Sequence, residues 1–546
     1  MHSRRLVRGL AATLSAVAVL GAGVGASVSV QASSGGGGVL NLGFTSDIHS
    51  LDPIQVADTQ SVVPTDAIYN TLLTYNHQSK VVPDLVTKWS IEDGGKLYVL
   101  HLRHGVEFSN GAAFNATDVV DEFVRDMTPK NADPYGFALS AIEGYSAFQK
   151  NPTGVPKGIT TPNQYTVDIQ LTQPQGFFLN VLTLPSIAAI PDPAQVAKYG
   201  QSYTNHPIGT GPFELSAYTP EHSLTLVPNP HYWGPKPKLS KVNMYFNLSP
   251  ETGLLEFERG QLDVFPAAAQ FELPSSDYLT VQANQTLRSQ YYRAPVVGIS
   301  FAFLNEQLVP AFRNVLVRQA INYAVSKIAL IRTFNGRGLP ATQVLPPGMP
   351  AYQPSLKGYP YNPTKAKALL AKAGYRHGFS VTFWTPSDPN YLNPAQVIAS
   401  ELGQVGIKVK LKTMTLSTYE SGMSANKIPM GFEYWTEDYP DPQDFLYYML
   451  DPAGIHGNGN FANWVNAKFA KLEETANSLP PSQDARRYAL YRQADDIAVE
   501  QAPWLFGWFP VQDALISSKL SPSPKKDLAD YLNPNLPLNL DIISKS

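Results

Sequence analysis

Helix-favouring and strand-favouring segments alternate between residues 362 and 411, and this alternation constrains the fold more than any other feature. The spacing predicts a helix over 363–373, because Asn362 is a good N-cap residue, Pro363 suits the first helical position and Gly374 follows the last turn. A strand, a helix and a strand are then expected at 379–384, 394–405 and 407–411. This regular succession predicts an α/β layer with a largely parallel sheet.

Other parts of the chain carry further helix and strand patterns. Amphipathic helices are expected at 115–127, 313–334 and 483–501. Strict alternation at 98–103 and 165–171 predicts strands in a different, strand-rich region. A length of 546 residues has room for two to four domains, which agrees with at least one strand-rich and one α/β region.

The first residues have the pattern of an export signal. Three arginines precede an apolar stretch over 10–30, and small residues follow it. We therefore expect a signal peptide over 1–32 and a flexible Ser/Gly tether over 33–38. The expected location is periplasmic or extracellular, in association with the cell envelope, and there is no Cys to carry a lipid anchor.

Composition excludes several classes of protein. The chain has no cysteine, which rules out a disulfide scaffold, a Cys-ligated metal site and a cysteine nucleophile. Lys and Arg number 41 against 44 Asp and Glu, and no basic block occurs, so a nucleic-acid partner is not expected.

Several short strings, each weak by itself, follow one another in order along the chain. They are Leu51-Asp52-Pro53, Val82-Pro83-Asp84-Leu85-Val86, Leu102-Arg103-His104-Gly105-Val106-Glu107-Phe108, Pro207-Ile208-Gly209-Thr210-Gly211-Pro212-Phe213, Asn229-Pro230-His231-Tyr232-Trp233-Gly234, Val317-Arg318-Gln319-Ala320-Ile321-Asn322-Tyr323-Ala324, Asp438-Tyr439-Pro440-Asp441-Pro442 and Ala502-Pro503-Trp504. In this order the chain resembles the family 5 extracellular solute-binding proteins, the peptide- and nickel-binding components of ABC importers.

The resemblance implies an α/β fold of the periplasmic binding protein type II kind, with two lobes, a hinge and an additional strand-rich domain. The implied first lobe is discontinuous and comprises 39–82, 205–300 and 510–546. The additional domain is expected over 83–204 and the second lobe over 301–509.

The implied function is that of a receptor which captures a peptide-like solute between the lobes and delivers it to an ABC permease in the membrane. The receptor is expected to be a monomer. An alternative ligand is an oligosaccharide, another polar nutrient or a metal chelate.

The segment 431–444 holds the candidate ligand-binding residues, which are Asp438, Trp435, Tyr434 and Tyr439. Asp438 matches the aspartate that receives the ligand's α-ammonium in peptide-binding members of the family, and Trp435 matches their cleft tryptophan. Tyr434 and Trp435 are neighbours on a predicted strand, so one is expected to line the cleft while the other enters the core.

Two further acids in this segment have local explanations. Asp441 stands at an N-cap position and Asp444 three residues later, where both meet free backbone N–H groups of a helix starting at Pro442. Met430 and Phe432 stand where the resemblance implies basic residues that meet a ligand carboxylate, so the group with that role stays open.

No catalytic residues, metal site or cofactor are predicted. The acids of 431–444 are too crowded to form the separated pair of a glycosidase, and their spacing lacks the alternating ligands of a calcium loop. Gly209-Thr210-Gly211 lacks the context of a phosphate-binding loop, and no Gly-x-Ser-x-Gly motif occurs. We therefore expect a binding protein and not an enzyme.

Overall fold

The computed structural model describes residues 38–267, 273, 275–455, 459–528, 538, 540 and 542–545. The expected signal peptide, and the expected tether up to residue 37, lie outside the described residues. In the part of the chain that is described, no helix is both long enough and apolar enough to cross a membrane.

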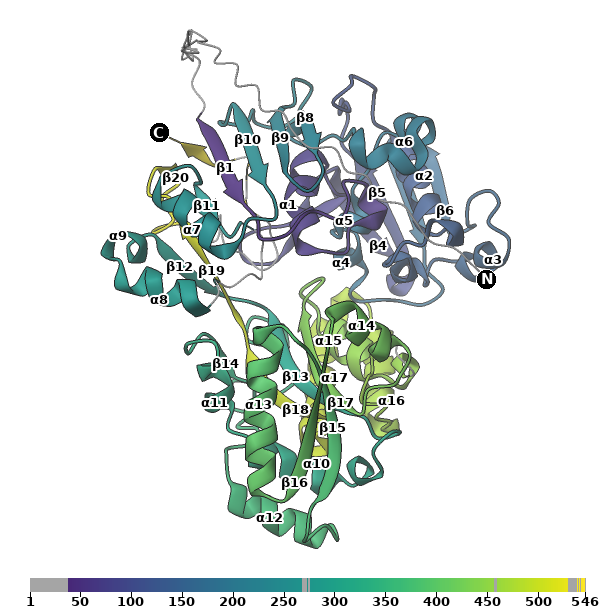
Figure 1. The fold of residues 1–546 in the computed structure, drawn as a ribbon. Coiled ribbons are helices and arrows are strands. Elements are labelled where there is room, and N and C mark those ends of the chain that lie inside the picture. Colours follow the sequence, from purple (N-terminus) through teal and green to yellow (C-terminus); the bar gives the residue numbers. More distant parts are fainter. Residues whose placement is uncertain are drawn as a thin grey trace, which may run out of the picture. The chain divides into compact units, whose positions relative to one another are not determined.

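A seven-stranded sheet combines segments from both ends of the chain (Figure 1). Strand β1 is parallel to β10 and β11, whereas the other pairs are antiparallel. The order is β12 (Tyr291–Pro295), β19 (Val511–Ile516), β11 (Val264–Phe265), β1 (Val39–Gly43), β10 (Lys241–Tyr245), β9 (Ser223–Pro228) and β8 (Phe213–Thr219). Its helices are α1 (Thr59–Ile68), α7 (Pro250–Glu258), α8 (Ser275–Ala283) and α9 (Gln285–Arg288). Strand β20 (Leu520–Ser521) pairs antiparallel with β21 (Ser544–Lys545).

A four-stranded antiparallel sheet forms in the strand-rich region and confirms the strands expected at 98–103 and 165–171. Its order is β4 (Val86–Glu92), β5 (Leu97–Leu102), β7 (Thr166–Gln170) and β6 (Ile159–Asn163). The surrounding elements are the hairpin β2 (Leu73–Tyr75) and β3 (Val81–Pro83), and the helices α2 (Ala116–Asp126), α3 (Tyr145–Lys150), α4 (Phe178–Val181), α5 (Pro185–Ala188) and α6 (Pro193–Tyr199). The buried core of this region extends from Leu72 to Ile190 and takes in Tyr439.

A six-stranded sheet carries the predicted α/β alternation, but it is not largely parallel as expected, because three of its five strand pairs are antiparallel. Strand β15 is parallel to β16 and to β17, while β13 pairs antiparallel with β17 and β18. The order is β14 (Leu339–Pro340), β18 (Trp504–Phe509), β13 (Gly298–Leu304), β17 (Met430–Thr436), β15 (Phe379–Pro386) and β16 (Ile407–Met414). Its helices are α10 (Val315–Ala324), α11 (Lys327–Arg332), α12 (Pro363–Lys372), α13 (Pro389–Gln404), α14 (Leu416–Ser424), α15 (Pro442–Leu450), α16 (Ala467–Asn477) and α17 (Asp484–Gln501).

Helix ends follow the side chains that can cap them. The Asn362 side chain accepts a hydrogen bond from the Lys365 N–H at 2.8 Å, which confirms the predicted start of α12. Helix α13 starts five residues before the predicted position, because the Asp388 carboxylate caps it through the Asn390 N–H at 2.8 Å.

The single helix predicted over 313–334 is wrong. Helix α10 ends at Ala324, Val325 is extended, and α11 starts at Lys327. The Ser326 hydroxyl accepts from the Ala329 N–H at 3.2 Å and so begins a new helix where the apolar periodicity continues without interruption.

Two chain crossings join the seven-stranded and six-stranded sheets. One leads from β12 to β13 through Val296, and the other leads from β18 to β19 through Pro510. The Val296 N–H donates to the Pro510 carbonyl at 3.3 Å, so the crossings lie side by side. Near them the Arg337 guanidinium binds the Asp513 carboxylate at 3.0 Å, and both side chains are fully buried. Paired crossings of this kind are what a hinge needs.

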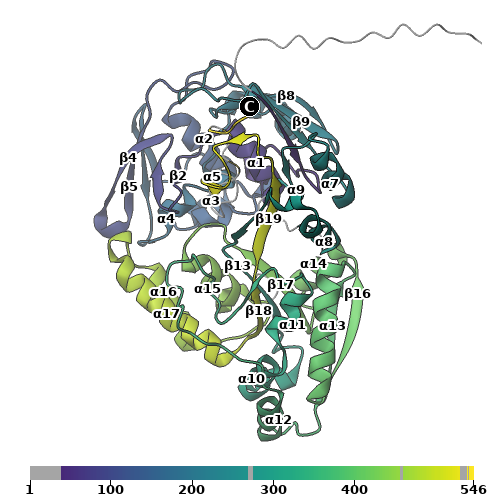
Figure 2. The same cartoon turned by 90° about the vertical axis from the view of Figure 1, so that its left-hand side faces the viewer.

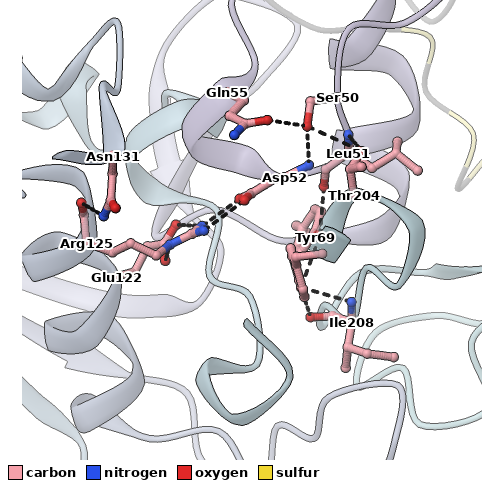
Figure 3. Close-up of polar contacts among 11 residues, drawn as sticks. Ser50, Leu51, Asp52, Gln55, Tyr69, Glu122, Arg125, Asn131, Thr204 and Ile208 are labelled. Atoms are coloured by element: carbon pink, nitrogen blue, oxygen red, sulfur yellow. Dashed lines mark hydrogen bonds and ion pairs between the residues drawn. The ribbon is translucent and has the colours of Figure 1, made fainter. Parts of the chain in front are cut away.

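The Leu51-Asp52-Pro53 string is held by buried polar contacts ahead of α1 (Figure 3). Arg125 of α2 binds Asp52 at 2.8 Å and Glu122 at 2.6 Å. The Leu51 carbonyl accepts from the Tyr69 hydroxyl at 2.9 Å, and the Leu51 N–H donates to the Thr204 hydroxyl at 2.9 Å. These contacts fix the segment that leads into the first turn of α1.

Candidate functional site

A cavity of about 480 Å³ is lined by segments from several parts of the chain. Its walls come from the start of α1, the hairpin strand β2, the segment between α4 and α5, residue Tyr135 and the end of β17. The described lining residues are Val56, Ala57, Asp58, Thr59, Gln60, Val62, Val63, Asp66, Thr71, Thr74, Tyr75, Tyr135, Thr183, Leu184, Pro185, Ser186, Tyr434, Trp435, Thr436, Glu437 and Asp438. A cavity of this size has room for a small organic ligand.

The turn from β17 into α15 positions the acids of the cavity. Asp441 is the N-cap of α15, as predicted, and its carboxylate accepts from the Gln443 N–H at 3.0 Å. Asp444 was expected to meet a free N–H of the helix, but its carboxylate accepts from the Asp438 N–H at 2.9 Å, before the helix, so the start of α15 also fixes the backbone of Asp438. The Glu437 N–H donates to the Val297 carbonyl at 2.9 Å, next to the Val296 crossing.

Asp438 lies in the cavity wall, and its carboxylate is held by Tyr135, another lining residue. Its Oδ1 atom accepts from the Tyr135 hydroxyl at 3.1 Å. Burial raises the pKa of Asp438 to about 7, although the hydrogen bond from Tyr135 acts in the opposite direction. An approaching ammonium group would favour the ionised carboxylate and form a charge-assisted hydrogen bond with it.

Glu437 is a second acid in the same wall, which sequence reasoning did not select. Its two carboxylate oxygens are buried and have no hydrogen-bond partner among the described residues. Burial, together with the negative charge of Asp438, raises the pKa of Glu437 well above its usual range. Burial therefore favours the protonated forms of both acids in the empty cavity, and a cation that enters the cavity would favour their ionised forms.

The three candidate aromatics have different surroundings. Trp435 and Tyr434 both line the cavity, because β17 ends there, so the cavity does not receive only one of them as expected. Trp435 also stacks on Tyr448 at 4.6 Å between ring centroids. Tyr439 is apart from the described lining residues: it is buried, stacks on Phe177 and donates to Gln443 at 2.5 Å.

A long-range ion pair that sequence reasoning missed stabilises the turn between β17 and α15. Arg487 of α17 donates to both carboxylate oxygens of Asp441 at 3.0 and 2.8 Å, and to Asp484 at 2.7 Å. Helices α16 and α17 lie side by side along this region (Figure 2). No local pattern marks Arg487 as a partner of Asp441, because 46 residues separate them.

The two positions on β17 where the resemblance implies basic residues are buried in the core. Met430 and Phe432 are 0% and 4% exposed and belong to the core of the six-stranded sheet. Lys427 is not among the described residues that line the cavity. Among the described residues there is also no group of three His, Asp or Glu side chains arranged to hold a metal ion.

The two joined α/β sheets, with a cavity at the turn after β17, define the class of protein. The fold is that of the type II periplasmic binding proteins, which are solute receptors. A periplasmic binding protein, DppA of Helicobacter pylori, solved with the peptide STSA, has this fold with a TM-score of 0.77 and 26% identity. The similarity covers 93% of this chain and 98% of that protein.

Sequence comparison identifies the family. The pattern of the bacterial extracellular solute-binding proteins, family 5, matches residues 80–457. The heme-binding protein A of Haemophilus influenzae is 30% identical over 477 residues, which are 84% of each chain. The dipeptide-binding protein of Escherichia coli is 28% identical over 460 residues, which are 80% of this chain and 83% of that one. The chain belongs to the family 5 extracellular solute-binding proteins, and these relatives are named as binding proteins and not as enzymes.

Proposed function

We propose that this protein is the receptor of an ABC importer and binds a peptide-like solute in the cavity beside β17. The observation that carries the proposal is the partly buried Asp438 carboxylate in the cavity wall, held by Tyr135 and by the turn into α15. The names of the dipeptide-binding relative and of the structure solved with a peptide support this ligand class.

In the proposed complex the ligand's free amino group binds Asp438. Trp435 and Tyr434 provide flat apolar walls that accept different side chains without requiring one. The hydroxyl groups of Thr71, Thr74 and Ser186 line the same cavity and are suited to hydrogen bonds with a polar backbone. Tyr439, which was the fourth candidate, would support the turn from the core.

Binding would be coupled to motion at the hinge. The crossings at Val296 and Pro510 allow the two larger sheets to rotate with little change inside either one. A ligand stabilises the closed arrangement only to the extent that it binds this arrangement better than the open one. The closed receptor would then dock on the membrane permease. In this role the chain binds and delivers the solute and catalyses no reaction.

The remaining parts of the proposal follow the sequence. We propose export by a signal peptide over 1–32 and action as a monomer in the periplasm or at the cell envelope. The proposed first lobe comprises 39–82, 205–300 and 510–546, the additional domain comprises 83–204, and the second lobe comprises 301–509. The seven-, four- and six-stranded sheets have separate buried cores, which supports a division into three parts. Two limits need a shift: Leu72 and Leu73 pack in the core of the strand-rich region, and the limit at 300 falls inside β13.

The first test is native mass spectrometry of the mature chain purified from its own cells. Released ligands that fragment as peptides are expected. Released sugars, or released metal chelates such as metalloporphyrins, would overturn the peptide assignment and favour the alternative ligand class.

The second test uses Asp438→Asn, with the exposed Glu420→Gln as a control that removes one negative charge outside the cavity. We expect Asp438→Asn to weaken binding of peptides with a free amino group about tenfold or more and to leave N-acetylated peptides nearly unchanged. An equal loss for both kinds of peptide would contradict the role given to Asp438.

A further inference from the structure

The cavity wall is rich in acidic side chains. Four acidic residues line it, Asp58, Asp66, Glu437 and Asp438, and no Lys, Arg or His occurs among the described lining residues. The remaining lining groups are hydroxyls, one amide, aromatic rings and apolar side chains. A free carboxylate on the ligand would therefore find no opposite charge in this wall, whereas cations would find several.

Two of these acids differ in how they are satisfied. Asp58 is the N-cap of α1 and accepts from the Ser61 N–H at 2.8 Å and the Ser61 hydroxyl at 2.7 Å. Its carboxylate is thus explained by the fold. The Glu437 carboxylate is buried with no hydrogen-bond partner among the described residues, although its backbone is fixed through Val297.

A buried carboxyl without a partner is costly, because it has lost its contact with water and gained nothing in return. Glu437 follows directly after the cavity-lining strand β17 and precedes the proposed ammonium anchor Asp438. One ammonium at Asp438 leaves the Glu437 carboxyl without a partner and in its protonated form. A ligand with two cationic groups would compensate both.

We propose that the cavity selects a dicationic ligand, whose α-ammonium binds Asp438 and whose second ammonium or guanidinium group binds beside Glu437. The simplest such ligand is a peptide that starts with Lys or Arg. Asp66 adds negative potential from α1, and Tyr434 and Trp435 line the same cavity, where an aromatic ring can attract a cation. This inference rests on the proposed function, since it assumes a peptide-like ligand anchored at Asp438.

The test is isothermal titration calorimetry of the mature full-length chain with matched peptides. One series starts with Lys and the other with norleucine, which has the same side-chain length without the charge. Both series continue with alanines to a total of two to five residues and end in an amide, so that no free carboxylate enters the cavity. The variants are Glu437→Gln and, as the matched control, Glu420→Gln.

We expect the wild-type chain and Glu420→Gln to bind the Lys series at least tenfold more tightly than the norleucine series. In Glu437→Gln this preference should fall to less than threefold, because the amide keeps the shape of the side chain and removes its charge. The norleucine series should bind Glu437→Gln about as well as it binds the wild-type chain.

The outcomes separate the two proposals. Binding of both series with equal affinity in the wild-type chain overturns the dicationic inference and leaves the peptide receptor intact. A Lys preference that persists in Glu437→Gln also overturns it, because another group would then carry the selectivity. Absence of binding at every length in both series counts against the peptide receptor, and with it against the inference.

Discussion

Arg487→Met is expected to destabilise the six-stranded part of the molecule strongly. The Arg487 and Asp441 side chains are 1% and 2% exposed, and they are joined by two hydrogen bonds. Methionine fills much of the same space but carries no charge. The variant therefore leaves the Asp441 carboxylate buried, with the Gln443 N–H as its hydrogen-bond donor at the start of α15.

Breaking a buried ion pair by removing one partner costs about 3 to 5 kcal/mol, because the remaining charge is uncompensated. For a cooperative unit of about 150 to 250 residues, 1 kcal/mol shifts Tm by about 2 to 4 °C. We therefore expect Arg487→Met to lower the Tm of the affected unit by about 6 to 20 °C. Adding Asp441→Asn should recover at least half of this loss, because Asn removes the charge and still caps α15.

The assay is differential scanning calorimetry of the wild-type chain, both single variants and the double variant at neutral pH. A fall of less than about 3 °C for Arg487→Met would show that the pair contributes little. A double variant that is less stable than Arg487→Met alone would refute the explanation by an uncompensated charge.

Three further perturbations test other parts of the structure. Because burial raises the pKa of Asp438 to about 7, the folded ligand-free chain keeps a proton that the unfolded chain releases above about pH 4. The stability of the folded chain should therefore fall as pH rises from about 4 to 7. In thermal unfolding, Asp438→Asn should show a smaller fall in stability over the same pH range. Asn362→Ala should lose about 1 kcal/mol of unfolding free energy in denaturant titration, whereas Asn362→Asp, which keeps the cap of α12, should lose much less. Gly378→Ala should lower Tm more than Gly94→Ala, although both glycines have positive φ. A Cβ at Gly378 would collide with the Gly406 carbonyl, whereas a Cβ at Gly94 would meet open space. Equal falls in Tm would contradict this explanation.

Local signals were enough to place many elements but not to join them. The cap and stop residues around α12 fixed that helix, since they act within a few positions of each other. The same periodicity failed at Ser326, where a hydroxyl cap outweighs a continuous apolar stripe. Local pattern therefore predicts an element well when its ends carry their own capping groups.

The candidate site was predicted in part. Asp438, Trp435 and Tyr434 came from one segment whose motif could be recognised, and all three line the cavity. Tyr135 could not be found in this way, because its contact with Asp438 joins residues 303 positions apart. Glu437 was visible in the sequence, but only its burial without a hydrogen-bond partner distinguishes it from a surface charge.

The position of β19 has a consequence for how the chain completes its fold. This strand lies between β12 and β11 in the seven-stranded sheet, yet it is made after every helix of the six-stranded part. Until residues 511–516 emerge, β11 and β12 have unpaired edges that can pair with other chains. The six-stranded sheet has all its strands once residue 509 is made, so the region that starts first in the sequence finishes last. A nascent chain of this protein therefore stays open to aggregation until nearly its whole length has been synthesised.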